Sequence, residues 1–167
     1  ALLHWTTQYF KDKHIASARL EAELLLAHAC GYSRIDLYLK ADQPLADKEK
    51  DIFRTFVRRR AEGVPVTYLI GNKDFWTLTL AVHEGVLIPR PDTEILVEAL
   101  CRQIKLWQQN FPAQSCKIME LGTGTGAIPL ALCDELEHLD IVSIDINPSA
   151  LKNAAENCQR YDHLFAP

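Results

Sequence analysis

The sequence of 167 residues contains one methionine, Met119, and no apolar run of the about 18 residues that a membrane-spanning helix needs. It also lacks a recognisable secretory signal, internal repeats and low-complexity segments. These absences argue against a transmembrane protein, a secreted protein and a repeat array. Because the chain starts at Ala1 rather than at methionine, we expect its native start to be missing or processed.

The five cysteines are scattered, odd in number and form no Cys-x-x-Cys pair. Such a pattern is typical of reduced thiols in a cytoplasmic protein, and we expect that location here. None of the six histidines stands at a ligand spacing from these cysteines, so we expect no structural metal site.

The apolar fraction of 48% and the charged fraction of 24% are those of an ordinary soluble protein with one or two domains. The net charge of −4 conceals an asymmetry: residues 1–73 hold 12 basic and 9 acidic side chains, whereas residues 74–167 hold 6 and 13. Part of the positive excess is the run from Arg58 to Arg60. This run is either a solvated helix face or a contact with an acidic partner, protein or nucleic acid.

Helical periodicity dominates the first part of the chain. Apolar spacing predicts helices over Ala16–Ala29, which would end at Gly31, and over Asp47–Glu62. Ser33 can cap a short helix through Leu39. We therefore predict a small helical bundle that forms a domain over residues 1–72.

The period changes to that of β-structure after residue 73. The alternation in Asp74–Val82 predicts a strand, which His83-Glu84-Gly85 would turn back into a second strand over Val86–Ile88. We predict that residues 73–91 form a β-hairpin linker.

The remaining residues, 92–167, predict an α/β domain. A helix starts at Asp92, and we expect its inner face to carry apolar side chains: Ile95, Leu96, Ala99, Leu100 and Ile104. Then follow a strand from Lys117, a glycine-rich turn, helix Ala127–Glu137, strand Ile141–Asp145 and a helix from Pro148 to Gln159. A doubly wound sheet needs several parallel strands, and only two are present. We expect the domain to be incomplete and the chain to be a fragment.

The glycine-rich turn carries the first functional signal. Glycines at 122, 124 and 126 permit a tight turn and the close approach of a ligand, and the next helix would direct its free N–H groups at that ligand. Asp145 lies 23 residues after Gly122, where its carboxylate can accept hydrogen bonds from ribose hydroxyls. The segment therefore predicts a nucleoside site, although glycine-rich turns also serve packing alone.

The identity of the nucleoside depends on Glu120. Gly122-x-Gly124-x-x-Ala127 also satisfies the dinucleotide fingerprint, which would indicate an NAD-dependent dehydrogenase. However, an acidic residue at the mouth of the turn would repel a pyrophosphate, whereas it suits the ammonium and sulfonium charges of S-adenosylmethionine. We therefore expect S-adenosylmethionine as cofactor.

A second motif is the string Ile88-Pro-Arg-Pro-Asp-Thr-Glu94, in which two prolines stiffen the backbone around Arg90. By itself this string could be a simple strand-to-helix corner. Together with Leu69-x-Gly71, Asp74-Phe-Trp76, Glu120–Gly126 and Asp145, it resembles the HemK/PrmC family of release-factor glutamine N5-methyltransferases. The glycine turn is common to many methyltransferases, whereas the Pro-Arg-Pro string is specific to this family.

The resemblance implies an N-terminal helical domain that binds the release factor, followed by a Rossmann-like class I methyltransferase domain. It implies that S-adenosylmethionine is bound by Glu120, Gly122, Thr123, Gly124, Thr125, Gly126 and Asp145, with Arg90 beside its methionine end. The substrate would be the glutamine in the Gly-Gly-Gln loop of a release factor, with no membrane and no direct nucleic acid partner.

The catalytic Asn-Pro-Pro-Tyr of the family is absent from these 167 residues. Asn147-Pro148-Ser149 resembles it only superficially and is typical of a helix start, so we assign no catalytic residue and expect this chain alone to be inactive. The alternatives are a methyltransferase acting on a ribosomal protein or nucleic acid, and a non-catalytic binding module.

Overall fold

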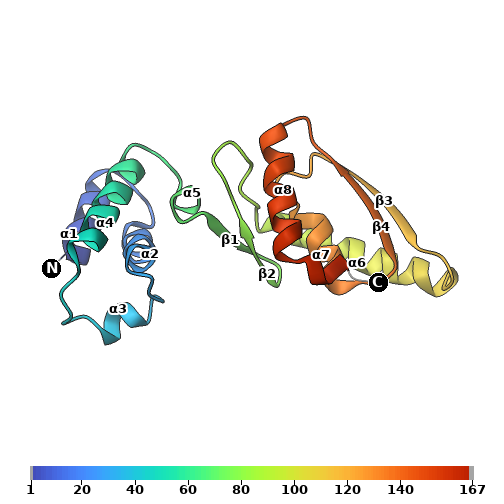
Figure 1. Ribbon diagram of the computed structural model, residues 1–167, viewed down its shortest axis with the longest axis horizontal. Coiled ribbons are helices and arrows are strands. Elements are labelled where there is room, and N and C mark those ends of the chain that lie inside the picture. Colours follow the sequence, from blue (N-terminus) through green and yellow to red (C-terminus); the bar gives the residue numbers. More distant parts are fainter. Residues whose placement is uncertain (1, 166–167) are drawn as a thin grey trace. The chain divides into compact units, whose positions relative to one another are not determined.

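The computed structural model describes residues 2–165 (Figure 1). The chain divides into two compact units, with the boundary between Ile70 and Gly71. The first unit is helical, and the second contains both helices and strands. The expected α/β class is therefore confirmed. The domain boundaries expected after residues 72 and 91 stay predictions.

The first unit consists of helices in chain order. They are α1 (Leu2–Asp12), α2 (Ala18–Cys30), α3 (Asp36–Leu39), α4 (Asp47–Ala61) and α5 (Val66–Ile70). The helices that the sequence predicted correspond to α2, α3 and α4. Helix α2 ends where Gly31 takes up a left-handed conformation with φ of 65°, which glycine adopts without steric strain. The Ser33 hydroxyl accepts a hydrogen bond from the Asp36 N–H at 3.2 Å, but the N-cap position of α3 is Ile35, so Ser33 lies two residues before the observed capping position.

The core of this unit brings together α1, α2 and α4. Phe10, Leu25 and Phe53 are almost fully buried and belong to one apolar cluster. Beside it lies a buried carboxylate, Glu23, which accepts hydrogen bonds from Arg19, Arg34 and Tyr38. Burial alone would raise the pKa of Glu23, but these hydrogen bonds outweigh it and lower the pKa to about 2.

The second unit begins with an antiparallel hairpin, β1 (Asn72–Phe75) and β2 (Leu78–Ala81), in which Phe75 pairs with Leu78. The strand predicted over Asp74–Val82 is therefore wrong, because the chain reverses at Trp76 and Thr77. The return strand predicted over Val86–Ile88 is also wrong, since those residues form a loop.

Tertiary contacts explain the position of this turn. Trp76 has a positive φ of 56°, which a bulky residue rarely adopts. Its backbone N–H donates to Glu94 at 3.1 Å, and its indole N–H donates to Glu135 at 3.0 Å. The Thr77 hydroxyl donates to Asp134. Because these acceptors are distant in the sequence, the local pattern could not indicate the turn.

Helix α6 spans Asp92–Asn110, as the sequence predicted. Its buried face is formed by Val97, Cys101 and Ile104. The expected inner face was correct for Ile104 and in part for Leu100, which is half-buried and packs against the core. It was wrong for the others: Ile95 is 68% exposed, Leu96 is 48% exposed and Ala99 is also exposed. The true face lies about one position away, because the contacts with α7 set the helix rotation.

The nucleoside segment folds as the sequence predicted. Strand β3 (Cys116–Leu121) pairs in parallel with β4 (Leu139–Ile144), from Cys116 opposite Leu139 to Leu121 opposite Ile144. Helix α7 (Ala127–Glu135) connects the two strands. Helix α8 (Pro148–Arg160) and a 3₁₀ helix, η1 (Asp162–Phe165), follow.

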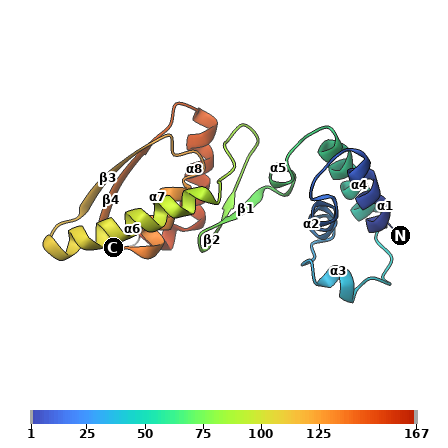
Figure 2. The ribbon, with the colours of Figure 1, turned by 180° about the vertical axis from the view of Figure 1, so that it is seen from behind.

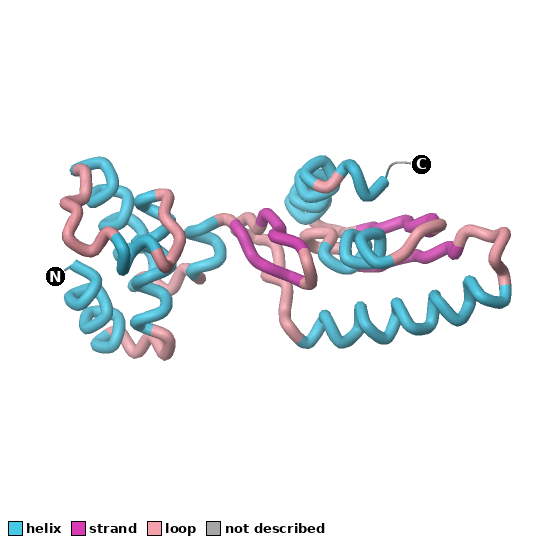
Figure 3. Tube along the Cα trace, turned by 90° about the horizontal axis from the view of Figure 1, so that it is seen from below, coloured by secondary structure: helices cyan, strands magenta, loops and turns pink. Residues whose placement is uncertain are grey.

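The helices α6, α7 and α8 form one layer of this unit. Figure 2 shows α6 beside α7, and α7 lies between α6 and α8 in Figure 3. Alternate residues of both strands face this layer, whereas the other residues point away: Met119 is 72% exposed and Val142 is 53% exposed. Within the described residues, the sheet is therefore covered on one face only.

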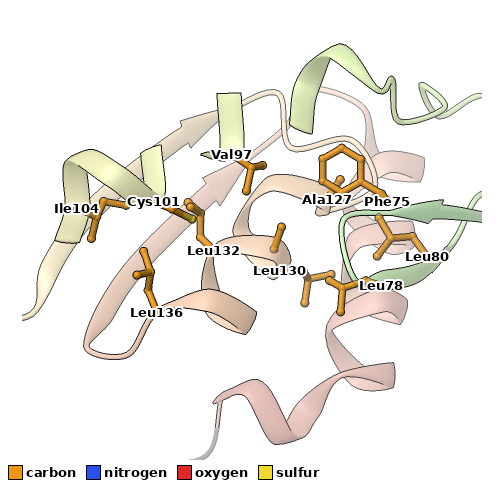
Figure 4. Close-up of a cluster of buried hydrophobic side chains, with 11 residues drawn as sticks. Phe75, Leu78, Leu80, Val97, Cys101, Ile104, Ala127, Leu130, Leu132 and Leu136 are labelled. Atoms are coloured by element: carbon orange, nitrogen blue, oxygen red, sulfur yellow. The ribbon is translucent and has the colours of Figure 1, made fainter. Parts of the chain in front are cut away.

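The core of the second unit joins the hairpin to the helical layer. Phe75 and Leu80 from the hairpin, Val97 from α6, and Leu130 and Leu132 from α7 are at most 1% exposed and belong to one cluster (Figure 4). The hairpin is thus an integral part of this unit. Among the described residues, we find no helix with the length and apolarity to cross a membrane.

Candidate functional site

A cavity of about 440 Å³ lies in the second unit, at the carboxyl ends of β3 and β4. Its wall comes from the loop after the hairpin, the start of α6, the glycine turn and the segment that joins β4 to α8. The lining residues are Gly85, Val86, Leu87, Pro89, Arg90, Thr93, Glu120, Gly122, Thr123, Gly124, Thr125, Ala127, Ile128, Asp145, Asn147 and Ala150. Ligands of open parallel sheets bind at this end of the strands.

The glycine turn forms the floor of the cavity. The N–H groups of Gly122 and Thr123 donate to the carbonyl of Ile144, at 2.8 and 3.1 Å, and so attach the turn to the end of β4. Gly124 has a φ of 59°, and a Cβ there would meet no atom within 4 Å. The dihedral angle therefore favours glycine, and the backbone is open to a ligand.

Asp145 connects the turn to the segment after β4. One carboxylate oxygen accepts the N–H of Asn147 at 2.9 Å, and the other accepts the N–H of Gly124 at 2.8 Å. These two backbone hydrogen bonds lower the pKa of Asp145, so the group is ionised at neutral pH. An ionised carboxylate of fixed orientation has further lone pairs with which to accept hydrogen bonds from a ligand.

Two polar side chains at the cavity lack a hydrogen-bond partner. The Oε2 atom of Glu120 and the Oγ1 atom of Thr123 are buried and bond to no other atom of the described residues. Buried polar atoms without partners are uncommon and call for a ligand or water. A carboxylate oxygen without a cation or donor is what a positively charged ligand group would satisfy. This observation fits the cofactor that the sequence predicts.

The loop after the hairpin forms the opposite wall. Pro89 is buried, whereas the neighbouring Arg90 is exposed and lines the cavity. Asn147 holds this loop, because its side-chain N–H donates to the carbonyl of Gly85 at 3.0 Å. The side-chain oxygen of Asn147 accepts the N–H of Ser149 at 3.0 Å. Asn147 is therefore the N-cap of α8, as the sequence indicated.

A row of side chains on α8 and at its C-terminal end binds the free edge of β2. Asn153 and Asn157 are fully buried, and their side-chain oxygens accept the N–H groups of His83 and Ala81, at 3.1 and 2.7 Å. The hydroxyl of Tyr161 accepts the N–H of Thr79 at 2.8 Å. The amide of Asn157 also donates to the carbonyl of Thr125 at 2.9 Å. Asn157 thus joins the hairpin to the glycine turn.

The structure gathers all eight residues that the sequence assigned to the cofactor at one place. Arg90, Glu120, Gly122, Thr123, Gly124, Thr125 and Asp145 line the cavity, and Gly126 starts α7 directly behind it. Their role in binding stays a prediction. Sequence reasoning missed the contributions of Gly85–Leu87 and of the two buried asparagines. For the asparagines, the spacing of four residues on an amphipathic helix was the available signal.

Metal chemistry finds no support in the geometry of the described residues. They contain no group of three or more histidine, cysteine or acidic side chains that could hold an ion. What the cavity provides is an ionised carboxylate, an unpaired carboxylate oxygen, a hydroxyl and open backbone. That combination suits an uncharged sugar next to a cationic group.

Comparisons with known families match both units. Residues 1–71 match the PrmC N-terminal domain, and residues 112–163 match a methyltransferase domain. The second match contains the glycine turn and Asp145.

Curated relatives match nearly the whole chain. A release factor glutamine methyltransferase of Rhodopirellula baltica is 41% identical over 95% of this chain and 53% of the relative. Proteins of the same name from Geobacter sulfurreducens and Escherichia coli are 36% and 39% identical, over 96% and 93% of the chain and 54% of each relative. The chain thus spans about half the length of the curated relatives that it matches. The chain is thus similar, over both matched domains and over nearly its whole length, to release factor glutamine methyltransferases.

Proposed function

We propose that the complete protein transfers a methyl group from S-adenosylmethionine to the glutamine of the Gly-Gly-Gln loop of peptide chain release factors. The observation that carries this proposal is the cavity at the ends of β3 and β4, in which an ionised Asp145 and the unpaired oxygen of Glu120 lie around an open glycine turn. The names of the relatives support the choice of substrate. A cytoplasmic location is part of the proposal.

Each part of the cavity has a distinct role in this proposal. Asp145 accepts hydrogen bonds from the ribose hydroxyls with the lone pairs that the backbone leaves free. Glu120 faces the cationic methionine end, and Arg90 lies near its carboxylate. The turn from Gly122 to Gly126 admits the nucleoside at close range. When bound, the cofactor supplies an electrophilic methyl group on a sulfonium.

The chemical difficulty lies in the nucleophile, because the lone pair of an amide nitrogen is delocalised into its carbonyl. An enzyme must hold this nitrogen in line with the methyl group, and acceptors must bind its N–H groups so that electron density stays on nitrogen. Positioning of this kind contributes several kcal/mol to catalysis, and oriented acceptors add more. The family uses an Asn-Pro-Pro-Tyr segment, which these 167 residues do not contain. We therefore propose that this chain alone does not methylate.

The test uses the complete protein, purified release factor and labelled S-adenosylmethionine, with mass spectrometry to locate the methyl group. We expect one methyl group on the glutamine of the Gly-Gly-Gln loop. The Asp145→Ala variant should bind the cofactor at least about tenfold more weakly, because hydrogen bonds to a charged group contribute roughly 1.5–3 kcal/mol. Methyl transfer to the release factor by the 167-residue chain would contradict the second half of the proposal.

Two other functions make different predictions in the same assay. A related methyltransferase acting on a ribosomal protein or on nucleic acid would label ribosomal subunits and leave the release factor unlabelled. A non-catalytic module would give no heat of cofactor binding in calorimetry with the folded complete protein. Neither function is favoured by a particular observation, whereas the Pro-Arg-Pro string at residues 89–91 favours the release factor enzyme.

A further inference from the structure

A second cavity, of about 190 Å³, lies within the helical unit between α1 and α4. We call it the α1–α4 groove. It is lined by Leu2, Trp5, Thr6, Tyr9, Phe53, Arg54, Val57 and Arg58. Phe53 and Val57 are 1% and 6% exposed and belong to the core of the unit, so the floor of the groove is apolar. A cavity of roughly 150 Å³ with apolar walls accommodates benzene, so one large apolar side chain fits here.

An exposed aromatic pair forms one wall of the groove. Trp5 is 58% exposed, and its ring stacks on that of Tyr9 with centroids 5.3 Å apart and an interplanar angle of 8°. The stack holds Trp5 in a defined position at the surface rather than in the core. Tryptophan and tyrosine in such positions are enriched among the residues that dominate protein–protein binding energy. The wall therefore has the character of a binding surface.

Basic side chains stand along the rim of the groove. Arg54 and Arg58 lie one turn apart on α4, and both line the groove. Arg54 forms an exposed pair with Asp51 at 3.0 Å, whereas the guanidinium of Arg58 forms no ion pair with the described residues. Residues 1–73 as a whole carry 12 basic and 9 acidic side chains. A cationic rim around an apolar floor is complementary to an acidic segment that presents one apolar side chain.

We infer that the α1–α4 groove is the docking site for such a segment, an acidic stretch of a partner protein that inserts one apolar side chain against Phe53 and Val57. Resting on the proposed function, this partner is the release factor, and the groove anchors it while its glutamine is presented to the other unit. Trp5 and Tyr9 pack against the inserted side chain. Arg58 pairs with a carboxylate at the rim. This ion pair increases the rate at which the release factor associates, and its contribution falls as the ionic strength rises.

The experiment compares four variants of the complete protein in release factor methylation and in calorimetric binding of the release factor. Trp5→Ala removes the aromatic wall, and Arg58→Glu reverses a rim charge. Leu39→Ala and Lys48→Glu make the same kinds of change at exposed positions of α3 and α4 outside the groove. We expect the two groove variants to raise the KM and Kd for release factor by about tenfold or more, with kcat and cofactor affinity unchanged. The two control variants should behave like wild type.

The outcomes separate the groove from the proposed function. If the wild type methylates the release factor and the groove variants have wild-type KM and Kd, the groove is not the docking site and the function stands. If the wild type binds the release factor without methylating it, and the groove variants lose binding, the function fails and the groove stands. If the wild type does not bind the release factor at all, both are refuted. Added salt should raise KM more steeply for the wild type than for Arg58→Glu.

Discussion

The buried carboxylate of Glu23 makes the stability of the helical unit depend on acidity. Glu23 is 2% exposed, and its pKa is about 2 in the folded chain against an ordinary 4.5. A depressed pKa means that the folded state prefers the ionised form. The stabilisation is therefore complete above about pH 4.5 and is lost as the pH falls toward 2. The difference between the two pKa values corresponds to about 3 kcal/mol.

The Glu23→Gln variant isolates this contribution. It keeps a side chain of the same shape that can accept hydrogen bonds from Tyr38 and the two arginines, but it cannot titrate. Between about pH 5.5 and about pH 3, the wild type should lose about 2 kcal/mol more unfolding free energy than the variant. Other carboxylates titrate in both proteins, so their contributions to the change in unfolding free energy cancel in the comparison. The variant should also be less stable at neutral pH, because Arg19 and Arg34 lose their charged partner.

Two measurements check this reasoning. Urea denaturation at both pH values gives the free energies, and hydrogen exchange of α2 peptides shows that the change belongs to the helical unit. A side-chain NMR titration reports the pKa of Glu23 directly. Equal pH dependence in the wild type and Glu23→Gln, or a titration near 4.5, would show that the hydrogen bonds do not overcome the desolvation of the carboxylate.

Two further predictions concern the second unit. Asn157→Ala should destabilise this unit by about 2–4 kcal/mol, because the N–H of Ala81 and the carbonyl of Thr125 both lose their bond to this side chain. At temperatures where both variants are folded, Asn157→Ala should weaken cofactor binding more than Asn153→Ala, because the hydrogen bonds of the Asn153 side chain go to His83 and Ala81 and not to the glycine turn. Equal cofactor affinities of the two variants in calorimetry would show that Asn157 does not fix the glycine turn. Gly126→Ala should cost about 1–2 kcal/mol in thermal unfolding, because φ is 78° and the new Cβ would lie 3.4 Å from the Cβ of Ala154. A stability like that of the wild type would show that the turn tolerates a side chain.

The segment from Cys116 to Arg160 could be predicted closely from the sequence because its determinants are local. Two apolar strands, three glycines with positive φ and Pro148 at the start of α8 each act within a few residues of their position. The placement of Asp145 beside Gly124 follows from the parallel pairing of β3 and β4, which brings the carboxyl ends of both strands together. In this segment the local sequence signals and the geometry of strand pairing therefore predict the same structure.

The hairpin could not be placed because its determinants are distant. The sequence from Asp74 to Val82 alternates like one strand, and nothing within it disfavours strand at Trp76. The turn is stabilised by acceptors on α6 and α7, at Glu94, Asp134 and Glu135. The rotation of α6 was misjudged for a similar reason, since Ile95 and Leu96 are as apolar as the residues that are buried. Composition does not distinguish two apolar faces of one helix.

The edge of β2 shows how the two parts of this unit depend on each other. A strand edge exposes N–H and C=O groups at every second residue, about 6.8 Å apart, and one helical turn advances by 5.4 Å. Because these repeats are similar, Asn153 and Asn157 of α8 and Tyr161 at its C-terminal end can each reach an N–H group of the strand or of its extension. The helix thus protects the edge as a further strand would. Asn157 also bonds to Thr125, so the same side chain that covers the edge fixes the glycine turn to the end of β2, a few residues before the loop that lines the opposite side of the cavity. The shape of the cavity therefore depends on α8, although α8 reaches its wall only at Ala150.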